Sequence, residues 1–279
     1  MQKLIRTSDR NLDSVVAIGD DTVSDIYFKL KTLNRGERFS YTLDGFESAA
    51  VVLSGSAKIV AGGETFQSVG KREDIWSGAA EAVYAGRNTS VEVEGISEQS
   101  EIAVAGGRCP EDFAPFMVSA ADGESIEVGS AESKSARRLQ HILGKNGEGR
   151  VSRLLVSEVF VHEGYWSGYP PHKHDLDNGD DETRHQEIYH YRFSPENGFG
   201  AQLWYDDAGA SQAYVTRTGD TFCFDSGYHP SVTSPGHSQY VFAILVGETR
   251  RPLIQNFEEK YRYLMKSTPG LDQMRDRFK

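Results

Sequence analysis

The stretch YPPHKHD, residues 169–175, places two histidines one residue apart, directly after two prolines. Pro171 holds Pro170 in an extended conformation, so the segment is expected to continue as a β-strand rather than as a helix. Side chains at positions i and i+2 of a strand point to the same face, which aims His172 and His174 at one point. Imidazole is the commonest side-chain ligand of borderline divalent metals, so this spacing predicts two ligands of a metal site.

A carboxylate and a further histidine extend this pattern. Glu187 opens the strand-like stretch EIYHYRF, and His229 lies in DSGYHP. The HxH pair taken alone is equally typical of surface histidines, and the two added residues favour a metal site. Such a set suits Zn²⁺, Mn²⁺, Fe²⁺ or Ni²⁺, with a position left open for water or substrate. The predicted ligands are His172, His174, Glu187 and His229. All eight histidines follow residue 140, so this chemistry belongs to the second half.

Short β-rich runs must position these residues, and they make up most of the chain. Examples are RLLVSEVFVHEG (153–164), AQLWYDD (201–207) and QYVFAILVG (239–247). Turns containing Gly, Asp and Asn separate the runs, which is typical of antiparallel sandwiches or barrels. Charged and apolar residues recur at helical spacing from about Gln255 to Lys279, which predicts a C-terminal helix that Pro269-Gly270 interrupts.

The composition changes in the middle of the chain. Residues 118–138 are small, polar and charged, as in a linker, and a β-rich block of similar length lies on either side. We therefore predict two related barrels in tandem. The first comprises residues 1–135, including the linker, and the second comprises residues 136–279.

Composition and charge restrict the class of protein. The chain has 279 residues, of which 38% are apolar and 25% charged, as in soluble globular proteins. A net charge of −11 repels a phosphate backbone, so a nucleic-acid partner is not expected. We find no signal peptide and no apolar run of membrane-spanning length, and Cys109 and Cys223 are isolated. These features predict a cytoplasmic protein without a membrane partner.

The order of HxH, Glu and GYHP resembles the two metal motifs of the cupin superfamily. The stretches RRLQHIL, LLVSEVFVHEGYWSGYPPHKHD, EIYHYRF and GYHP resemble the 5-deoxy-glucuronate isomerases of bacterial myo-inositol catabolism, strongly over residues 137–247 and more loosely before them. The resemblance implies an all-β bicupin of two tandem, jelly-roll-like barrels, in which only the C-terminal barrel binds a metal. The N-terminal barrel, where Glu47 has no accompanying histidine, is then structural or an assembly surface.

The sequence departs from this family in two places. Asp225 stands where the second motif usually has a proline. This departure affects the turn beside His229. The chain has RRPLIQNFEEKYRYL where the family carries a Trp/Phe-His-Asp-Pro signature. The second departure concerns a pocket wall or an oligomer contact.

The resemblance also implies an activity, the aldose–ketose isomerisation of 5-deoxy-D-glucuronate to 5-dehydro-2-deoxy-D-gluconate. A metal acting as a Lewis acid would polarise the C1 carbonyl and stabilise an enediolate, while a base moves a proton between C2 and C1. Glu187 is the candidate catalytic residue, with a water molecule or an inward-facing tyrosine as alternatives. The substrate carboxylate should meet an Arg or Lys side chain. The candidate substrate-binding residues are Arg184, which we favour, Lys173, Tyr189, Tyr191, Gln202 and Tyr240.

Three other functions remain open on the sequence alone. They are a 4-deoxy-uronate ketol-isomerase of pectin breakdown, an Fe²⁺ oxygenase and a sugar-acid-binding cupin without turnover. The four ligand-type residues disfavour the last, because a binding protein needs no open Lewis-acid site. In each isomerase reading the partner is a small sugar acid, and we expect a homo-oligomer that assembles through sheet edges or faces.

Overall fold

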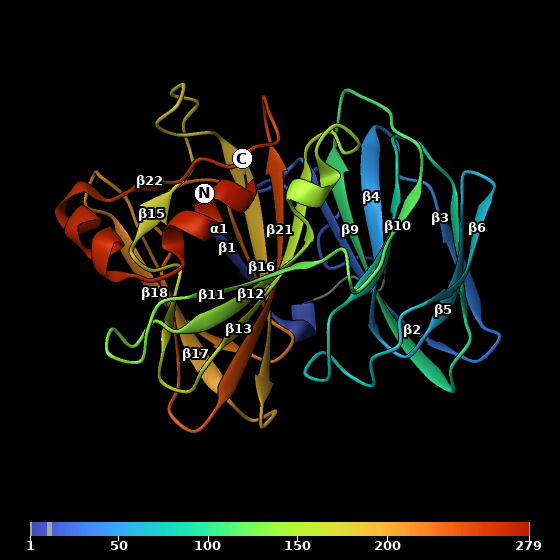
Figure 1. The fold of residues 1–279 in the computed structure, drawn as a ribbon, viewed down its shortest axis with the longest axis horizontal. Coiled ribbons are helices and arrows are strands. Elements are labelled where there is room, and N and C mark those ends of the chain that lie inside the picture. The colour runs from blue at the N-terminus through green and yellow to red at the C-terminus, as the bar shows by residue number, and fades with distance from the viewer. Residues whose placement is uncertain (1, 10–12, 279) are drawn as a thin grey trace.

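The protein consists of two β-rich units side by side in a computed structural model that describes residues 2–9 and 13–278 (Figure 1). Residues 1, 10–12 and 279, which the predicted domains include, lie outside the described residues. The central strands of both units pair in antiparallel fashion. The predicted fold class is confirmed, since the chain is mostly β-strand and ends in a short helix.

The first unit is built from two sheets, a five-stranded one in the order β10-β7-β4-β9-β2 and a four-stranded one in the order β3-β8-β5-β6. Phe46, Ile59 and Val104 belong to the core between these sheets. The strands are β2 (Ile26–Asn34), β3 (Arg38–Tyr41), β4 (Phe46–Ser54), β5 (Ala57–Ala61), β6 (Glu64–Val69), β7 (Glu81–Ala85), β8 (Val91–Gly95), β9 (Gln99–Arg108) and β10 (Phe116–Val118).

The second unit has a seven-stranded sheet in the order β1-β19-β16-β21-β13-β12-β11, a four-stranded sheet β14-β20-β17-β18 and the pair β15-β22. Its strands are β1 (Lys3–Ile5), β11 (Glu124–Val128), β12 (Arg137–Leu143), β13 (Leu154–Val161), β14 (Trp166–Ser167), β15 (His172–Lys173), β16 (His185–Ser194), β17 (Phe199–Tyr205), β18 (Ser211–Arg217), β19 (Thr221–Phe224), β20 (Ser231–Thr233), β21 (Ser238–Gly247) and β22 (Asn256–Phe257).

Short helical segments occur at the ends and between the units. They are the 3₁₀ turns η1 (Thr7–Asp9), η2 (Lys145–Gly147) and η3 (Glu259–Ser267), followed by the helix α1 (Leu271–Phe278). Pro269-Gly270 separates η3 from α1, and Gly270 has a φ of 74°, which favours glycine. Leu271 and Met274 of α1 are buried in the core of the second unit. The predicted C-terminal helix is therefore present, in two pieces.

The predicted division at residue 135 stays a prediction, and strand pairing bears on it in two places. β1 pairs with β19, with Lys3 opposite Cys223. β11 pairs with β12, with Glu124 opposite His141. Both strands precede the predicted boundary and belong to the sheet of the second unit. Residues far apart in the chain thus complete one sheet, which local composition does not reveal.

The large sheets of the two units pack against each other. Val51 of β4 shares a core with Ile188 and Ile244 of the second unit. Neighbouring residues of β4, such as Val52, face the core of the first unit, so this strand is covered on both sides and is almost continuously apolar. A Cβ on Gly107 of β9 would lie 2.9 Å from Cγ2 of Val246, so glycine allows the sheets to approach closely.

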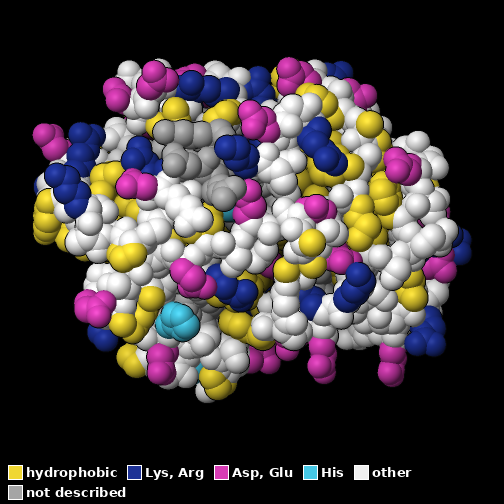
Figure 2. Space-filling view, viewed as in Figure 1, with side chains coloured by type: hydrophobic (Ala, Val, Ile, Leu, Met, Phe, Trp, Pro, Cys, Tyr) yellow, Lys and Arg dark blue, Asp and Glu magenta, His cyan; other side chains and the backbone are white. Residues whose placement is uncertain are grey.

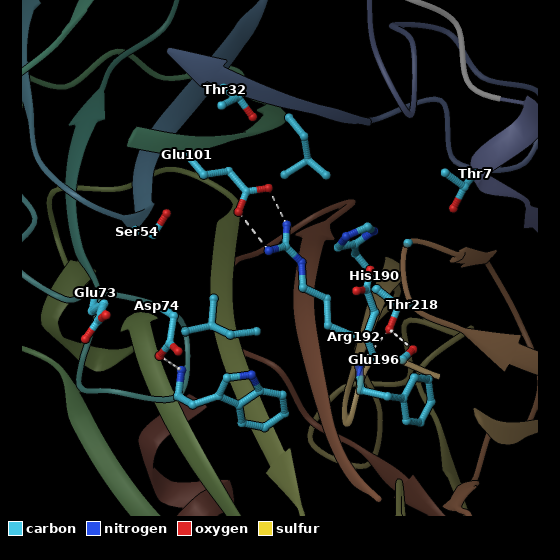
Figure 3. A pocket seen from close by; sticks show the side chains of 15 residues that line it. Thr7, Thr32, Ser54, Glu73, Asp74, Glu101, His190, Arg192, Glu196 and Thr218 are labelled. Carbon is cyan, nitrogen blue, oxygen red and sulfur yellow. Dashed lines mark hydrogen bonds and ion pairs between the residues drawn. The ribbon is translucent and has the colours of Figure 1, made fainter. Parts of the chain in front are cut away.

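Two ion pairs cross this contact. Arg72 of the first unit binds Glu158 of β13, with Nη1–Oε2 and Nη2–Oε1 distances of 3.0 and 2.6 Å, and both side chains are buried. Arg192 of β16 binds Glu101 of β9 at the edge of an open pocket of about 660 Å³ between the units (Figure 3). The first pair belongs to the core of the contact and the second to its rim.

Glu47 of β4 joins the first unit to the start of β13. Its carboxylate accepts hydrogen bonds from the backbone N–H groups of Ser152, Arg153 and Leu154 at 2.8, 2.6 and 2.8 Å. The Tyr84 hydroxyl donates a fourth bond at 2.6 Å. The first-unit carboxylate noted in the sequence therefore holds the second unit in place.

We expect Glu47→Gln to lower the free energy of unfolding by about 3 kcal/mol, because an amide NH₂ would face buried N–H donors. Urea denaturation measures the loss. Glu92→Gln is the matched control, since Glu92 is half exposed and its change should stay within about 0.5 kcal/mol. Equal stabilities for the two variants would contradict the role given to Glu47.

The surface in view carries Lys/Arg and Asp/Glu side chains that are interspersed, without a broad patch of one sign (Figure 2). Among residues 2–9 and 13–278, no helix combines the length and apolar character that a bilayer crossing requires.

Candidate metal centre

Three separate segments of the second unit, around residues 172–174, 187 and 229, bring the predicted ligands toward one point. His172 lies on β15, which pairs with β22 so that His172 is opposite Phe257. Glu187 lies on β16 between β19 and β21, opposite Phe224 and Leu245. His229 lies in the turn between β19 and β20, where Gly227 has a φ of 84°. The strand pairs thus fix the backbone at His172 and Glu187.

Three of the side chains converge closely. His174 Nε2 lies 3.0 Å from Glu187 Oε2, and His229 Nε2 lies 3.5 Å from the same oxygen. One ligand atom from each of these three buried residues lies within 4.8 Å of the others. The His172 ring is next to them, with its centroid 4.9 Å from that of His229, and its Nε2 lies 2.9 Å from the side-chain amide nitrogen of Gln255.

Backbone carbonyls orient all three imidazoles. Nδ1 of His172, His174 and His229 lies 3.2, 3.0 and 2.9 Å from the carbonyl oxygens of Pro170, His185 and Gly227, respectively. A carbonyl only accepts, so each Nδ1 carries the hydrogen and each Nε2 keeps its lone pair. This is how histidine ligands are held in metal sites, where the other ring nitrogen donates to a neighbouring acceptor.

Burial governs the charge of these groups. It lowers the pKa of His172 to about 3 and the pKa of His229 well below its usual value, so both rings are neutral. Burial raises the pKa of Glu187. Burial also acts to lower the pKa of His174, but the hydrogen bond that its ring donates to the Glu187 carboxylate and the charge of that carboxylate outweigh burial, so the pKa is raised.

The donor set fits a divalent cation. His229 Nε2 is buried and has no hydrogen-bond partner among the described residues, although it lies close to a carboxylate oxygen. Two electron-rich atoms facing each other in a buried place are stabilised by a positive charge between them. His174, Glu187 and His229 are the residues that can hold such an ion, with His172 beside them. Nitrogen and oxygen ligands suit the borderline metals named above.

Asp175 positions the turn that carries His229. Its Oδ2 accepts a hydrogen bond from the Gly227 N–H at 2.8 Å, and Gly227 O in turn binds the His229 ring. Lys173 binds the other carboxylate oxygen at 2.8 Å. Burial acts to raise the pKa of Asp175, but the Lys173 ammonium and the Gly227 N–H outweigh it and lower that pKa.

We expect Asp175→Asn to weaken the binding of a divalent metal by a factor of about 10–100, because the turn would lose part of its support. Competition with a coloured chelator measures the affinity. Asp207→Asn is the control, because Asp207 also lies near Lys173, at 3.6 Å, but is largely exposed and has no bond to Gly227. An unchanged metal affinity in Asp175→Asn would show that Asp175 is not needed to position the His229 turn.

The other predicted site residues occupy different places. Tyr189 lines a small cavity beside Glu187. Tyr191 donates to Gln202, whose amide donates to His229 O at 2.8 Å, so this pair supports the His229 turn. Tyr240 donates to Glu158 at the contact between the units.

The two predicted cations lie outside that cavity. Lys173 is surrounded by carboxylates, with Asp175, Glu182 and Asp207 within 4 Å of its Nζ. Arg184 is 39% exposed and forms an ion pair with Glu248 at 2.5 Å. Their assignment to substrate binding stays a prediction.

The cavity also contains residues that sequence reasoning missed. Its volume is about 50 Å³, and Arg137 and Gln255 line it together with His172, Glu187 and Tyr189. Gln255 belongs to the stretch RRPLIQN, where the sequence departs from the family pattern. On the sequence alone, this departure relates to a pocket wall or an oligomer contact. Arg137 opens the stretch RRLQHIL, where strand alternation predicts that one arginine points inward without saying which.

Comparisons with known proteins agree with this architecture. The model of a family described as the KduI/IolB family matches residues 3–264. A Geobacillus kaustophilus protein named 5-deoxy-glucuronate isomerase is 31% identical over 242 residues, which are 85% of this chain and 86% of that protein. A Halalkalibacterium halodurans protein of the same name is 26% identical over 259 residues, covering 90% and 94% of the two chains.

Solved structures show the same fold. An IolB-like protein from Salmonella typhimurium LT2 has a TM-score of 0.84 at 24% identity, covering 91% of this chain and 96% of its own. An oxalate decarboxylase from Lactobacillus farciminis has a TM-score of 0.60 at 8% identity, covering 85% and 80%. Similarity of this second kind, at such low identity, extends to the fold alone.

Proposed function

Because this chain belongs to the KduI/IolB family, we propose that it is a divalent-metal-dependent isomerase that converts 5-deoxy-D-glucuronate into 5-dehydro-2-deoxy-D-gluconate. The relatives named 5-deoxy-glucuronate isomerase support this substrate. The observation that carries the metal is the convergence of His174, Glu187 and His229, buried and with ring Nε2 atoms turned inward.

The reaction moves hydrogen within one molecule. A proton leaves C2 and is added to C1, and the hydroxyl proton on O2 is replaced by one on O1, so atoms and electrons balance without a redox cofactor. When bound, a divalent cation supplies Lewis-acid polarisation of the carbonyl. Glu187 is the carboxylate among the described residues that line the cavity, and we assign the carbon-to-carbon proton transfer to it. Tyr189 lines the same cavity, and we assign to its hydroxyl a hydrogen bond to a substrate oxygen.

The test is a direct assay of the purified protein with 5-deoxy-D-glucuronate in D₂O, followed by NMR. We expect the aldehyde signal to be replaced by that of the ketose, with deuterium from the solvent at C1. Treatment with a chelator should abolish the conversion, and Zn²⁺, Mn²⁺, Fe²⁺ or Ni²⁺, added separately, should restore it to different degrees. Full conversion by the metal-free protein would contradict the proposed metal dependence.

Parallel assays separate the alternatives. Faster conversion of the related 4-deoxy-uronate would replace the proposed substrate with that one. Oxygen uptake during turnover would indicate an oxygenase, and binding without conversion of either sugar acid would indicate a binding protein. Each result is distinct from the ketose formation expected here.

We also propose that the two units have different roles. The described residues of the first unit contain no histidine, and its Glu47 is engaged with the second unit, so we assign metal binding to the second unit alone. Homo-oligomeric assembly and a cytoplasmic location are further proposals. Gel filtration with light scattering tests the first, and cell fractionation tests the second.

A further inference from the structure

Arg137 is a buried arginine that has no carboxylate partner in the described part of the chain. Only 3% of its surface is exposed, and it opens β12 in the second unit. Its guanidinium donates to two backbone carbonyls, Ser135 O at 3.0 Å and Tyr169 O at 2.8 Å. No ion pair to it occurs among the side chains of residues 2–9 and 13–275. Two of its five N–H groups are thereby occupied, and the rest remain for another acceptor.

Two other arginines of this protein are compensated by carboxylates. Arg72 meets Glu158 and Arg192 meets Glu101. Burial lowers the pKa of Arg137 to about 10, so the guanidinium is charged at neutral pH while no anion balances it. An uncompensated buried charge is unfavourable, so an anion that reaches the Arg137 guanidinium would be stabilised there.

The place of Arg137 indicates which anion this is. It lines the same cavity as His172, Glu187 and Tyr189. The cavity floor is the inner face of four neighbouring strands, which contribute alternate residues: Arg137 and Leu139 of β12, Ser157 and Val159 of β13, Ala243 and Leu245 of β21, and Glu187 and Tyr189 of β16. Among these lining residues Arg137 is the cation, and Glu187 belongs to the metal-ligand group.

We propose that Arg137 binds the carboxylate of the sugar acid and thereby directs its carbonyl end toward His172, His174, Glu187 and His229. This inference rests on the proposed function, which supplies a substrate with a carboxylate at one end and an aldehyde at the other. An arginine fork matches a carboxylate with two parallel hydrogen bonds. A fixed far end holds the reacting carbons in one place, which favours catalysis through orientation.

The size of the cavity adds a requirement. About 50 Å³ accommodates one or two water molecules, so a sugar acid enters only when covering side chains move outward. Leu253 and Met274 belong to the lining and come from the C-terminal segment, Met274 from α1. Arg137 is held by the backbone carbonyls of Ser135 and Tyr169, so it can keep its position when Leu253 and Met274 move.

The test compares Arg137→Met with Arg251→Met. Arg251 is a matched control, because it also donates to two carbonyls, Leu154 O and Gly144 O, and burial also lowers its pKa to about 10, but it lies outside the cavity lining. Two probes are used with each variant. One is 5-deoxy-D-glucuronate under turnover, and the other is the same sugar acid with its aldehyde reduced to an alcohol, measured by calorimetry.

We expect Arg137→Met to weaken binding of the reduced sugar acid about 10²-fold and to raise KM for the substrate by a similar factor. Arg251→Met should lower the melting temperature and leave both quantities near wild type. Arg137→Lys, which keeps the charge but not the fork, should recover part of the affinity. It also replaces Arg137→Met if the latter does not fold.

Three results would settle the assignment. Wild-type affinity for the reduced sugar acid in both Arg137 variants would overturn it, even if the protein is an isomerase. A loss in Arg137→Met and Arg251→Met alike would also overturn it, since that marks a structural effect. If wild type binds the reduced sugar acid and Arg137→Met does not, the assignment of Arg137 to the carboxylate is confirmed. This holds even when no conversion of 5-deoxy-D-glucuronate occurs and the proposed reaction is wrong.

Discussion

His174→Ala is expected to remove the divalent metal from the protein and to lower kcat/KM for 5-deoxy-D-glucuronate by about 10³-fold or more. His174 Nε2 lies 3.0 Å from Glu187 Oε2, and its ring centroid lies 5.0 Å from that of His229, so this imidazole contacts both other members of the converging group. The substitution removes one ligand and leaves the Glu187 carboxylate buried beside a gap. Elemental analysis for bound metal and the NMR assay together measure the effect.

His162→Ala is the control for this variant, because His162 is exposed near the end of β13 and should change neither metal content nor turnover. A His174→Ala protein with one metal per chain and wild-type kcat/KM would show that the converging residues do not carry the reaction. A folded, metal-free and inactive variant is the expected combination. Circular dichroism distinguishes it from an unfolded one.

Arg72→Met is expected to lower the free energy of unfolding by about 3–5 kcal/mol, because it leaves Glu158 as an uncompensated charge between the two units. Arg72 and Glu158 side chains are 2% and 0% exposed, and Tyr240 also donates to Glu158, at 2.7 Å. Urea denaturation measures the change. The double variant Arg72→Met with Glu158→Leu should recover most of the loss, since it removes both buried charges.

Arg192→Met supplies the comparison at the rim of the same contact. Arg192 and Glu101 are 21% and 23% exposed beside the open pocket in Figure 3, and the loss there should be about 1 kcal/mol. If Arg72→Met and Arg192→Met were equally stable, burial would not determine how much each ion pair contributes to the free energy of unfolding. If the double variant were less stable than Arg72→Met, packing rather than charge would hold the units together.

The sequence contained much of the metal centre because its ligands lie in local patterns. The HxH spacing after two prolines and the carboxylate that opens EIYHYRF are readable from a few neighbouring residues, and the structure has His174 and Glu187 in contact. The β-rich character and the C-terminal helix follow likewise from local periodicity. Family resemblance then supplied the tandem arrangement, which strand periodicity only suggested.

The rest depends on contacts between distant residues. Arg137 owes its position to the carbonyl of Tyr169, which approaches it from another strand connection. The carbonyls that orient His174 and His229 depend on the folded loops around residues 185 and 227. Arg184 was favoured for the substrate carboxylate because it precedes Glu187, and its ion pair with Glu248 depends on the strand register of β16 against β21. None of these contacts has a short-range signature.

The pairing of β1 with β19 has a consequence for how the protein is made. β1 precedes the whole first unit in the chain, whereas β19 follows it, with Lys3 opposite Cys223. Strands β2 to β10 find their partners within the first unit and can fold once that unit has been made, while β1 must wait for a partner about 220 residues later. Until β19 emerges, Ile5 remains without its buried place, and a nascent chain halted before that point exposes an unpaired apolar segment to chaperones.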